Sequence, residues 1–341
     1  MKDIIAIGSV TRDAFFDASD FSVIAWEKTP SGKGLVLPLG DKMEVKKVFF
    51  TIGGNSANAS VTFARQGFAT ACIGRVGNDV PGEEIRRKLS EEKIDVRALS
   101  TDKKLLTAYS VLLLKDGERT ILSYHGASND FNFSDFTTKD LKAKWWYLSL
   151  AGDSYRSFRK FITRAGKENI AVAFNPSGYH LRKDKGSILS SLKNISLLVL
   201  NEEEAAILTG IPFSREREVF RRLDDLTSPG ILAVTNGAQG VTVSDGRCIY
   251  RAGTFKEKKL VDRTGAGDAF GSGFVAGLMK SGIALSNLRR TTKEHVVEAI
   301  RVATANATSV VEHIGATEGI LTRKELGTPR WKNLKIKIEE L

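Results

Sequence analysis

The sequence is poor in the residues that stabilise secreted or fibrous proteins. Its 341 residues include two cysteines, Cys72 and Cys248, and only 7 prolines against 31 glycines. Two cysteines cannot build the disulfide framework of a secreted domain, and they fit a reducing compartment. The chain carries no repeated or compositionally biased tract, which excludes collagen-like and disordered proteins.

Long apolar segments and metal-binding motifs are lacking as well. The longest early apolar run, Ile4 to Ile7, is far too short for a signal peptide or a membrane span. The four histidines are scattered, and none has the spacing of a metal site. We therefore expect a soluble, cytoplasmic protein that binds no membrane.

Charge of one sign is not concentrated anywhere. The chain has 51 Lys and Arg against 40 Asp and Glu, a formal net charge of +11. Such a balance is compatible with nucleic acid, an anionic substrate or simply a basic surface. The basic residues are dispersed in mixed-sign stretches such as 83–88, which is typical of solvated helix faces. We therefore expect no nucleic-acid partner.

The hydrophobic pattern is that of an α/β protein. Short apolar runs occur at 4–7, 71–74, 146–150, 170–174, 197–200 and 231–235. Segments with helical periodicity lie between them, at 56–66, 82–93, 155–168 and 202–208. This alternation predicts a doubly wound, mostly parallel sheet with helices on both faces. No linker divides the chain, so we expect a single domain over residues 1–341.

Two stretches interrupt the alternation. Residues 33–52 contain extended runs around a Gly40-Asp41 turn, and residues 107–124 contain two β-rich runs around Asp116-Gly117. Asp-Gly between such runs is a strong hairpin signal. We expect a small β-sheet lid formed by inserted segments at 13–50 and 105–126, with ordinary edge strands of the main sheet as the alternative. Separately, the alternating pattern at 335–338 indicates a final edge strand.

The segment 261–271 carries the clearest chemical signal. Small residues at Gly265, Ala266 and Gly267 allow backbone N–H groups to converge, and the apolar residues that follow recur at helical spacing. We therefore predict an anion site at a helix N-terminus. Asp268 beside it is a candidate base for an attacking hydroxyl. The alternatives are a helix cap for Asp268 and a packing role for the glycines.

Other glycine-rich nucleotide motifs do not fit this chain. A dinucleotide fingerprint would require glycine at Phe270 and an early position in the chain. A Walker A loop ends in Gly-Lys-Ser or Gly-Lys-Thr, which none of the glycine clusters supplies.

A second cluster combines paired glycines with two asparagines: Gly53, Gly54, Asn55 and Asn58. Paired glycines permit close backbone approach, and asparagine side chains offer donors and acceptors suited to a polyhydroxyl ligand. The alternative is a tight turn followed by a capped helix.

Together these segments resemble the ribokinase-like (PfkB) family of carbohydrate kinases. The resemblance covers nearly the whole chain in order: the first strand with Asp13, then 53–58, 74–82, 201–204, 234–240 and 262–268. The family has a doubly wound α/β domain with a small β lid. It implies an enzyme that transfers the γ-phosphoryl group of ATP–Mg²⁺ to a hydroxymethyl group of a small sugar or sugar-like substrate.

The resemblance also implies roles for single residues. Asp268 corresponds to the catalytic base, and 265–267 to the anion hole for the transferred phosphoryl group. Contacts to substrate hydroxyls are implied for Asp13, Gly53, Gly54, Asn55 and Asn58.

Further implied roles concern the nucleotide and the metals. Asn201 and Glu204 match an Asn-x-x-Glu motif that orders Mg²⁺ through water. Positions along the nucleotide site are Thr235, Gly237 and Asn306. A monovalent cation such as K⁺ is implied near Asp262, the carbonyl of Thr264 and the loop at Gly315.

Some positions depart from the family pattern. Arg263 replaces a small hydroxyl residue, and it reaches either the ATP phosphates or solvent. The segment 173–176 lacks a leading aspartate, and 125–128 replaces a frequent Gly-Ala-Asn. These changes blur which sugar is used but leave Asp268 and its glycine loop intact.

Three alternatives to a sugar kinase remain open at this stage. A nucleoside acceptor requires an apolar lid surface, for which Phe15, Phe16, Phe21 and Trp26 are candidates. A non-catalytic sensor of sugar or nucleotide and a nucleic-acid-binding protein are the alternatives from other classes.

The oligomeric state is a separate expectation. Free strand edges of the lid favour a homodimer.

Overall fold

The computed structural model describes residues 1–341 except 30, 116–117 and 229. Its main body is built on a ten-stranded sheet of order β16-β15-β14-β13-β12-β11-β10-β1-β6-β7. The parallel strands are β1 (Lys2–Gly8), β6 (Thr70–Gly77), β7 (Leu99–Asp102), β10 (Ala143–Ser149), β11 (Ala171–Phe174), β12 (Leu197–Asn201) and β13 (Ile231–Thr235). Antiparallel strands extend one edge: β14 (Val241–Ser244), β15 (Cys248–Ala252) and β16 (Ile336–Glu340). The predicted α/β sheet and its final edge strand are confirmed.

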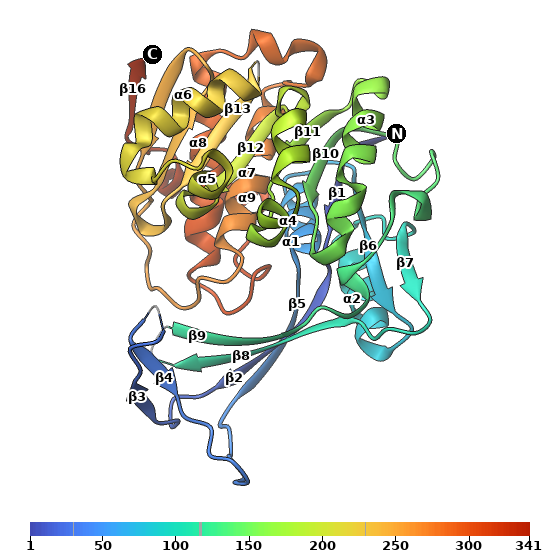
Figure 1. The fold of residues 1–341 in the computed structure, drawn as a ribbon, viewed down its shortest axis with the longest axis vertical. Coiled ribbons are helices and arrows are strands. Elements are labelled where there is room, and N and C mark those ends of the chain that lie inside the picture. The colour runs from blue at the N-terminus through green and yellow to red at the C-terminus, as the bar shows by residue number, and fades with distance from the viewer. Residues whose placement is uncertain (30, 116–117, 229) are drawn as a thin grey trace.

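Helices cover both faces of this sheet (Figure 1). One face packs against α1 (Asn55–Arg65), α7 (Ala266–Lys280) and α8 (Lys293–Val310). The other packs against α3 (Phe158–Glu168), α4 (Gly178–Ser191), α5 (Glu202–Thr209) and α6 (Glu216–Thr227). The remaining helices are α2 (Val80–Glu91), beside α1, and α9 (Arg323–Leu326), beside α8.

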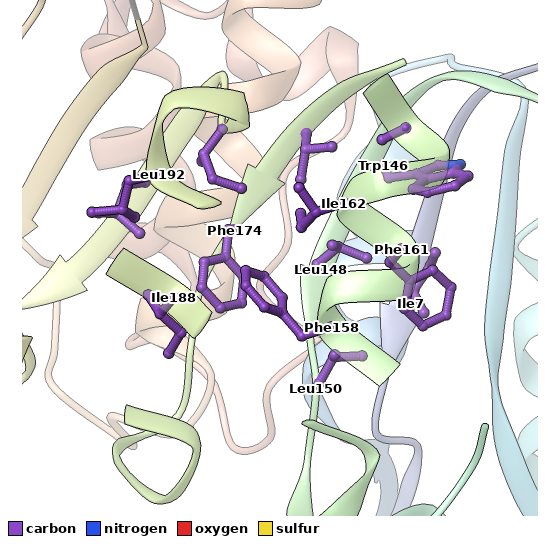
Figure 2. Packing of buried hydrophobic residues seen from close by; sticks show 14 of the residues in the cluster. Ile7, Trp146, Leu148, Leu150, Phe158, Phe161, Ile162, Phe174, Ile188 and Leu192 are labelled. Atoms are coloured by element: carbon purple, nitrogen blue, oxygen red, sulfur yellow. The ribbon is translucent and has the colours of Figure 1, made fainter. Parts of the chain in front are cut away.

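Strand β10 shows why the central strands are apolar throughout. Trp146 and Leu148 point toward α3, where the Trp146 ring meets the ring of Phe161 edge-on (Figure 2). Trp145 and Tyr147 alternate with them and join the core on the opposite face. A strand buried on both faces therefore reads as a continuous apolar run.

The lid is a separate four-stranded sheet of order β5-β2-β8-β9, which extends below the main body in Figure 1. Its strands are β2 (Thr11–Asp17), β5 (Val48–Gly53), β8 (Ala108–Lys115) and β9 (Glu118–Tyr124). The hairpin predicted for 107–124 is confirmed by the β8–β9 pairing, and its Asp116-Gly117 turn lies outside the described residues.

The hairpin predicted for 33–52 is wrong. Its first run forms β4 (Lys33–Leu35), which pairs with β3 (Val23–Ala25), whereas its second run is β5, paired with β2. Strand β2 follows β1 out of the main sheet, and β5 leads back into α1. The two strands that connect lid and main body therefore lie next to each other.

The register of the lid arranges its side chains in rows. Thr51, Asp13, Ser110 and Ser123 lie opposite one another and form a polar row. Two residues further along each strand, Phe49, Phe15, Leu112 and Ile121 form an apolar row on the same face, because side chains two apart point to the same side. Among the described residues, no helix is long and apolar enough to cross a bilayer.

Candidate active site

Helix α7 begins at an open backbone cradle. Its N-cap, Gly265, has φ 77°, and a Cβ there would lie 2.4 Å from the Cβ of Ala316, so this position requires glycine. The N–H of Ala269 donates to the carbonyl of Gly265 at 2.8 Å, which leaves the N–H groups of Gly267 and Asp268 free of the helix ladder. A Cβ on Gly267 would meet nothing within 4 Å. The helix start is therefore open to a bound anion, which the helix dipole favours.

Asp268 lies in the first turn of α7 and is partly exposed. Asn58 Nδ2 donates to its Oδ2 at 2.8 Å. Burial raises the pKa of Asp268 to about 6, against the lowering effect of the Asn58 hydrogen bond and with a further increase from the charge of Asp13. The carboxylate is therefore ionised at neutral pH, yet more basic than an ordinary aspartate.

Asp13 reaches the same region from β2, at the base of the lid. It is buried, and Thr11 Oγ1 donates to its Oδ1 at 2.9 Å. A Cβ on Gly53 would lie 1.9 Å from Asp13 Oδ2, so the glycine makes room for this carboxylate. Burial raises the pKa of Asp13 as well. The structure thus brings Asp13, Gly53 and Asn58 together around Asp268.

The other two residues of the glycine-asparagine cluster, Gly54 and Asn55, contact the main sheet at the start of α1. Gly54 precedes α1 with φ 93°, and a Cβ on it would lie 2.5 Å from the carbonyl oxygen of Ser9. Asn55 Nδ2 donates to Ser149 Oγ at 2.7 Å, at the carboxyl end of β10. These contacts attach the start of α1 to the carboxyl edge of the main sheet.

A cavity of about 320 Å³ lies beside the cradle and shares Ala266 and Gly267 with it. Thr235 and Gly237 line it, as do Phe255 and Phe270. Asn306 is not among its lining residues. Its side-chain amide donates to the carbonyl of Ala269 at 2.9 Å and accepts from the N–H of Leu321 at 3.0 Å. Asn306 therefore fastens α8 to its neighbours.

The sequence analysis missed Thr304, which lines this cavity from α8. Thr304 is buried, and its hydroxyl has no hydrogen-bond partner among the described residues. A buried hydroxyl without a hydrogen-bond partner destabilises the protein, so the Thr304 hydroxyl is suited to form a hydrogen bond with a ligand in the cavity. The sequence signal that could have revealed it is the helical spacing of the residues that line the cavity from α8: Thr304, Ala307, Thr308 and Val311.

Asn201 and Glu204 lie at the carboxyl end of β12. Glu204 Oε2 accepts from the N–H of Asn201 at 2.9 Å, and Asn201 Oδ1 accepts from the N–H of Glu204 at 2.8 Å, which caps α5. Burial raises the pKa of Glu204. The described residues contain no group of three or more metal-ligating side chains. Glu204 supplies one carboxylate at this strand end, a donor that fits Mg²⁺, because Mg²⁺ keeps several waters and binds mainly through substrate phosphates.

Asp262 organises the loop before the cradle. Its Oδ1 accepts from the N–H of Thr264 at 2.9 Å and from Thr264 Oγ1 at 2.7 Å, and its Oδ2 accepts from the N–H of Gly315 at 3.2 Å. The structure therefore brings together the three residues implied for a monovalent cation. Arg263, between them, is exposed and lines the cavity.

The site lies at the carboxyl edge of a doubly wound sheet, where enzymes of this architecture bind nucleotides. An anion cradle, an adjoining cavity and a facing lid thus define an α/β nucleotide-binding enzyme. The sequence model of the pfkB family of carbohydrate kinases matches residues 1–323 of this chain. This chain belongs to that family and is an ATP-dependent carbohydrate kinase.

Individual proteins that are similar to this chain in sequence or in fold are sugar kinases as well. The chain is 27% identical to the ribokinase of Haemophilus influenzae over 301 residues, covering 84% of this chain and 89% of that protein. It is 28% identical to a fructokinase of Escherichia coli over 289 residues, covering 80% and 90%. The fold is similar to that of Arabidopsis thaliana ribokinase complexed with ribose and ATP, with a TM-score of 0.73, 21% identity and coverage of 97% and 99%.

Proposed function

We propose that this kinase transfers the γ-phosphoryl group of ATP to a hydroxymethyl group of a small sugar or sugar-like substrate, with Asp268 as the base. The observation that carries the proposal is the position of Asp268, a partly exposed carboxylate next to an open cradle and within 2.8 Å of Asn58. Asp13, Gly53, Gly54, Asn55 and Asn58 would bind or shape the space for the acceptor hydroxyls.

In the proposed reaction, Asp268 accepts the proton of the acceptor hydroxyl as its oxygen attacks the γ-phosphorus. The bond from the γ-phosphorus to the bridging oxygen breaks, and ADP leaves with that oxygen. The N–H groups of Gly267 and Asp268 stabilise the charge on the transferred group. Phosphoryl transfer depends mainly on positioning and charge, so a base of moderate strength suffices.

The nucleotide would occupy the 320 Å³ cavity, with Thr235 and Gly237 along it and Thr304 as a hydrogen-bond partner. Bound Mg²⁺ would neutralise phosphate charge, held through water by Glu204 beside Asn201. We assign Asp262, the Thr264 carbonyl and the Gly315 loop to a K⁺ site that would stabilise the cradle. Asn306 would act on this site only by holding α8 in place.

A nucleoside acceptor is the second candidate, favoured by the apolar row of the lid. Phe15 belongs to this row, on the same face as Asp13, and Phe49 in the same row is exposed. Phe16 points to the opposite face, and Phe21 packs inside the lid. An acceptor with its hydroxyls at the polar row would thus place a planar base against Phe49.

We also propose a homodimer through the lid. Among the described residues, the outer strands β5 and β9 each pair on one side only and leave an edge free. On the face opposite Asp13, Phe50 and Leu122 lie in one row and are 51% and 53% exposed. Free edges beside exposed apolar side chains favour pairing with a second copy of the chain.

The decisive experiment measures ADP formation with ribose, fructose, 2-keto-3-deoxygluconate and adenosine, for wild type and Asp268→Asn. We expect turnover with one of these acceptors and a decrease in kcat of roughly 10²- to 10⁴-fold in the variant. Wild-type turnover in Asp268→Asn would refute the base. Thermal stabilisation by ATP without ADP formation on any acceptor would favour a sensor.

The same variant has a built-in control for folding. Because the pKa of Asp268 is raised to about 6, its ionised form is disfavoured in the folded state, so its stabilising contribution is present at low pH and lost as the pH rises through about 6. At pH 8, Asp268→Asn should therefore melt no lower than wild type. An inactive variant that melts much lower would reflect unfolding instead of a lost base.

A further inference from the structure

The cavity beside the cradle contains little positive charge. Among the described residues that line it, Arg263 is the only basic one and Glu257 the only acidic one. Arg263 directly precedes Thr264 and Gly265, whose conformation forms the start of the cradle. Its side chain therefore extends from the loop that forms the start of the anion cradle.

Arg263 also contacts the lid. Its Nη1 lies 3.7 Å from Glu118 Oε1, at the start of β9. The two side chains are 53% and 78% exposed, and such a solvated pair is weak and easily rearranged. The lid and the cradle loop therefore meet at a charge contact that a stronger anion can alter.

We propose that Arg263 binds the terminal phosphates of the nucleotide and couples their presence to the lid through Glu118. This inference rests on the proposed function, because it requires a nucleotide in the cavity. Arg263, a residue that departs from the family pattern, would then bind the nucleotide, and the lid could respond to a triphosphate before the acceptor binds.

The chemistry of arginine supports this dual contact. A guanidinium has five N–H donors in a fixed plane, and it binds phosphate oxygens in a bidentate manner. It can hold a phosphate with one edge and the Glu118 carboxylate with another. A lysine at this position would offer a point charge without the second edge.

The first test measures Kd for AMP-PNP and for AMP, each with Mg²⁺, by calorimetry. We expect Arg263→Gln to weaken AMP-PNP by roughly 10- to 100-fold, the loss of a charge-assisted hydrogen bond, and to change AMP by less than about twofold. The matched control is Arg87→Gln, which removes another exposed arginine paired with a glutamate, on α2. It should leave both affinities unchanged.

The second test follows hydrogen exchange in β9. AMP-PNP should slow exchange in wild type but AMP should not. Glu118→Gln should lose this protection while its Kd for AMP-PNP stays within about threefold of wild type, because a weak exposed pair contributes little. Arg263→Lys should retain part of the affinity and little of the protection.

The outcomes separate this inference from the function on which it rests. Equal effects of Arg263→Gln on AMP-PNP and AMP, no effect on either, or β9 protection that persists in Glu118→Gln would overturn the role of Arg263 while the kinase assignment stands. If wild type binds neither nucleotide, the proposed nucleotide site fails and this inference fails with it.

Discussion

At the residue scale, the pKa of Asp268 connects the geometry to a measurable pH profile. Burial is the main cause of its elevation to about 6, and the hydrogen bond from Asn58 opposes that elevation. Because the base must be ionised, kcat/KM should decrease as the pH falls through about 6.

Removing the Asn58 hydrogen bond tests this relation. In Asn58→Ala the pKa of Asp268 should rise, so the acidic limb of the pH profile should shift upward by roughly 0.5 to 1 pH unit. Asn55→Ala is the control, since the Asn55 amide bonds Ser149 and makes no contact with Asp268. An unmoved limb in Asn58→Ala would mean that another group sets the profile.

The unpartnered hydroxyl of Thr304 gives a second prediction at this scale. Thr304→Val keeps the shape of the side chain and removes the unsatisfied hydroxyl, so the free protein should become more stable by about 1 kcal/mol, while ATP should bind roughly 3- to 10-fold more weakly. Denaturant melts and calorimetry measure both effects.

Ser60 provides the comparison for Thr304, because among the described residues its buried hydroxyl has no partner apart from the Cys72 thiol, and Ser60 does not line the cavity. Ser60→Ala should not change ATP affinity. Unaltered ATP binding in Thr304→Val would remove Thr304 from the nucleotide site.

At the scale of the element, the start of α7 separates two uses of glycine. Gly265 is required by its φ of 77° and by the contact with Ala316, so Gly265→Ala should destabilise the fold by about 1–3 kcal/mol. Gly267 has open space around it, so Gly267→Ala should fold normally.

The functional outcome for Gly267→Ala follows from that open space. Its new methyl group would project into the cradle, so kcat should fall by at least tenfold at an unchanged melting temperature. Steady-state kinetics and thermal melts of the two variants provide the comparison. Wild-type kcat in Gly267→Ala would show that the phosphoryl group does not bind against this residue.

At the scale of the whole molecule, the proposed homodimer would have its interface on the lid. Phe50→Glu combined with Leu122→Glu places charges in the exposed row, so sedimentation should change from dimer to monomer. Val80→Glu is the control, because Val80 is 75% exposed on α2, outside the lid. A wild-type monomer at all protein concentrations would contradict the dimer.

Local sequence determined much of the main body. The apolar runs and helical periods predicted the parallel strands other than β7 and several of the helices, because strands buried on both faces leave a continuous apolar signal. The small residues at 265–267 indicated a helix start for a different local reason: only small side chains let backbone N–H groups converge there.

Tertiary structure decided the pairings and neighbours that no local pattern encodes. Strand β5 pairs with β2 instead of with the run at 33–35, because both connect the lid to the main sheet. Asn306 and Thr304 lie two residues apart on one helix, yet the first fastens the core and the second lines the cavity. The sequence alone thus indicated the central strands, several helices and the glycine-rich start of α7; only the folded chain decided which side chains share a site, since that depends on packing between distant segments.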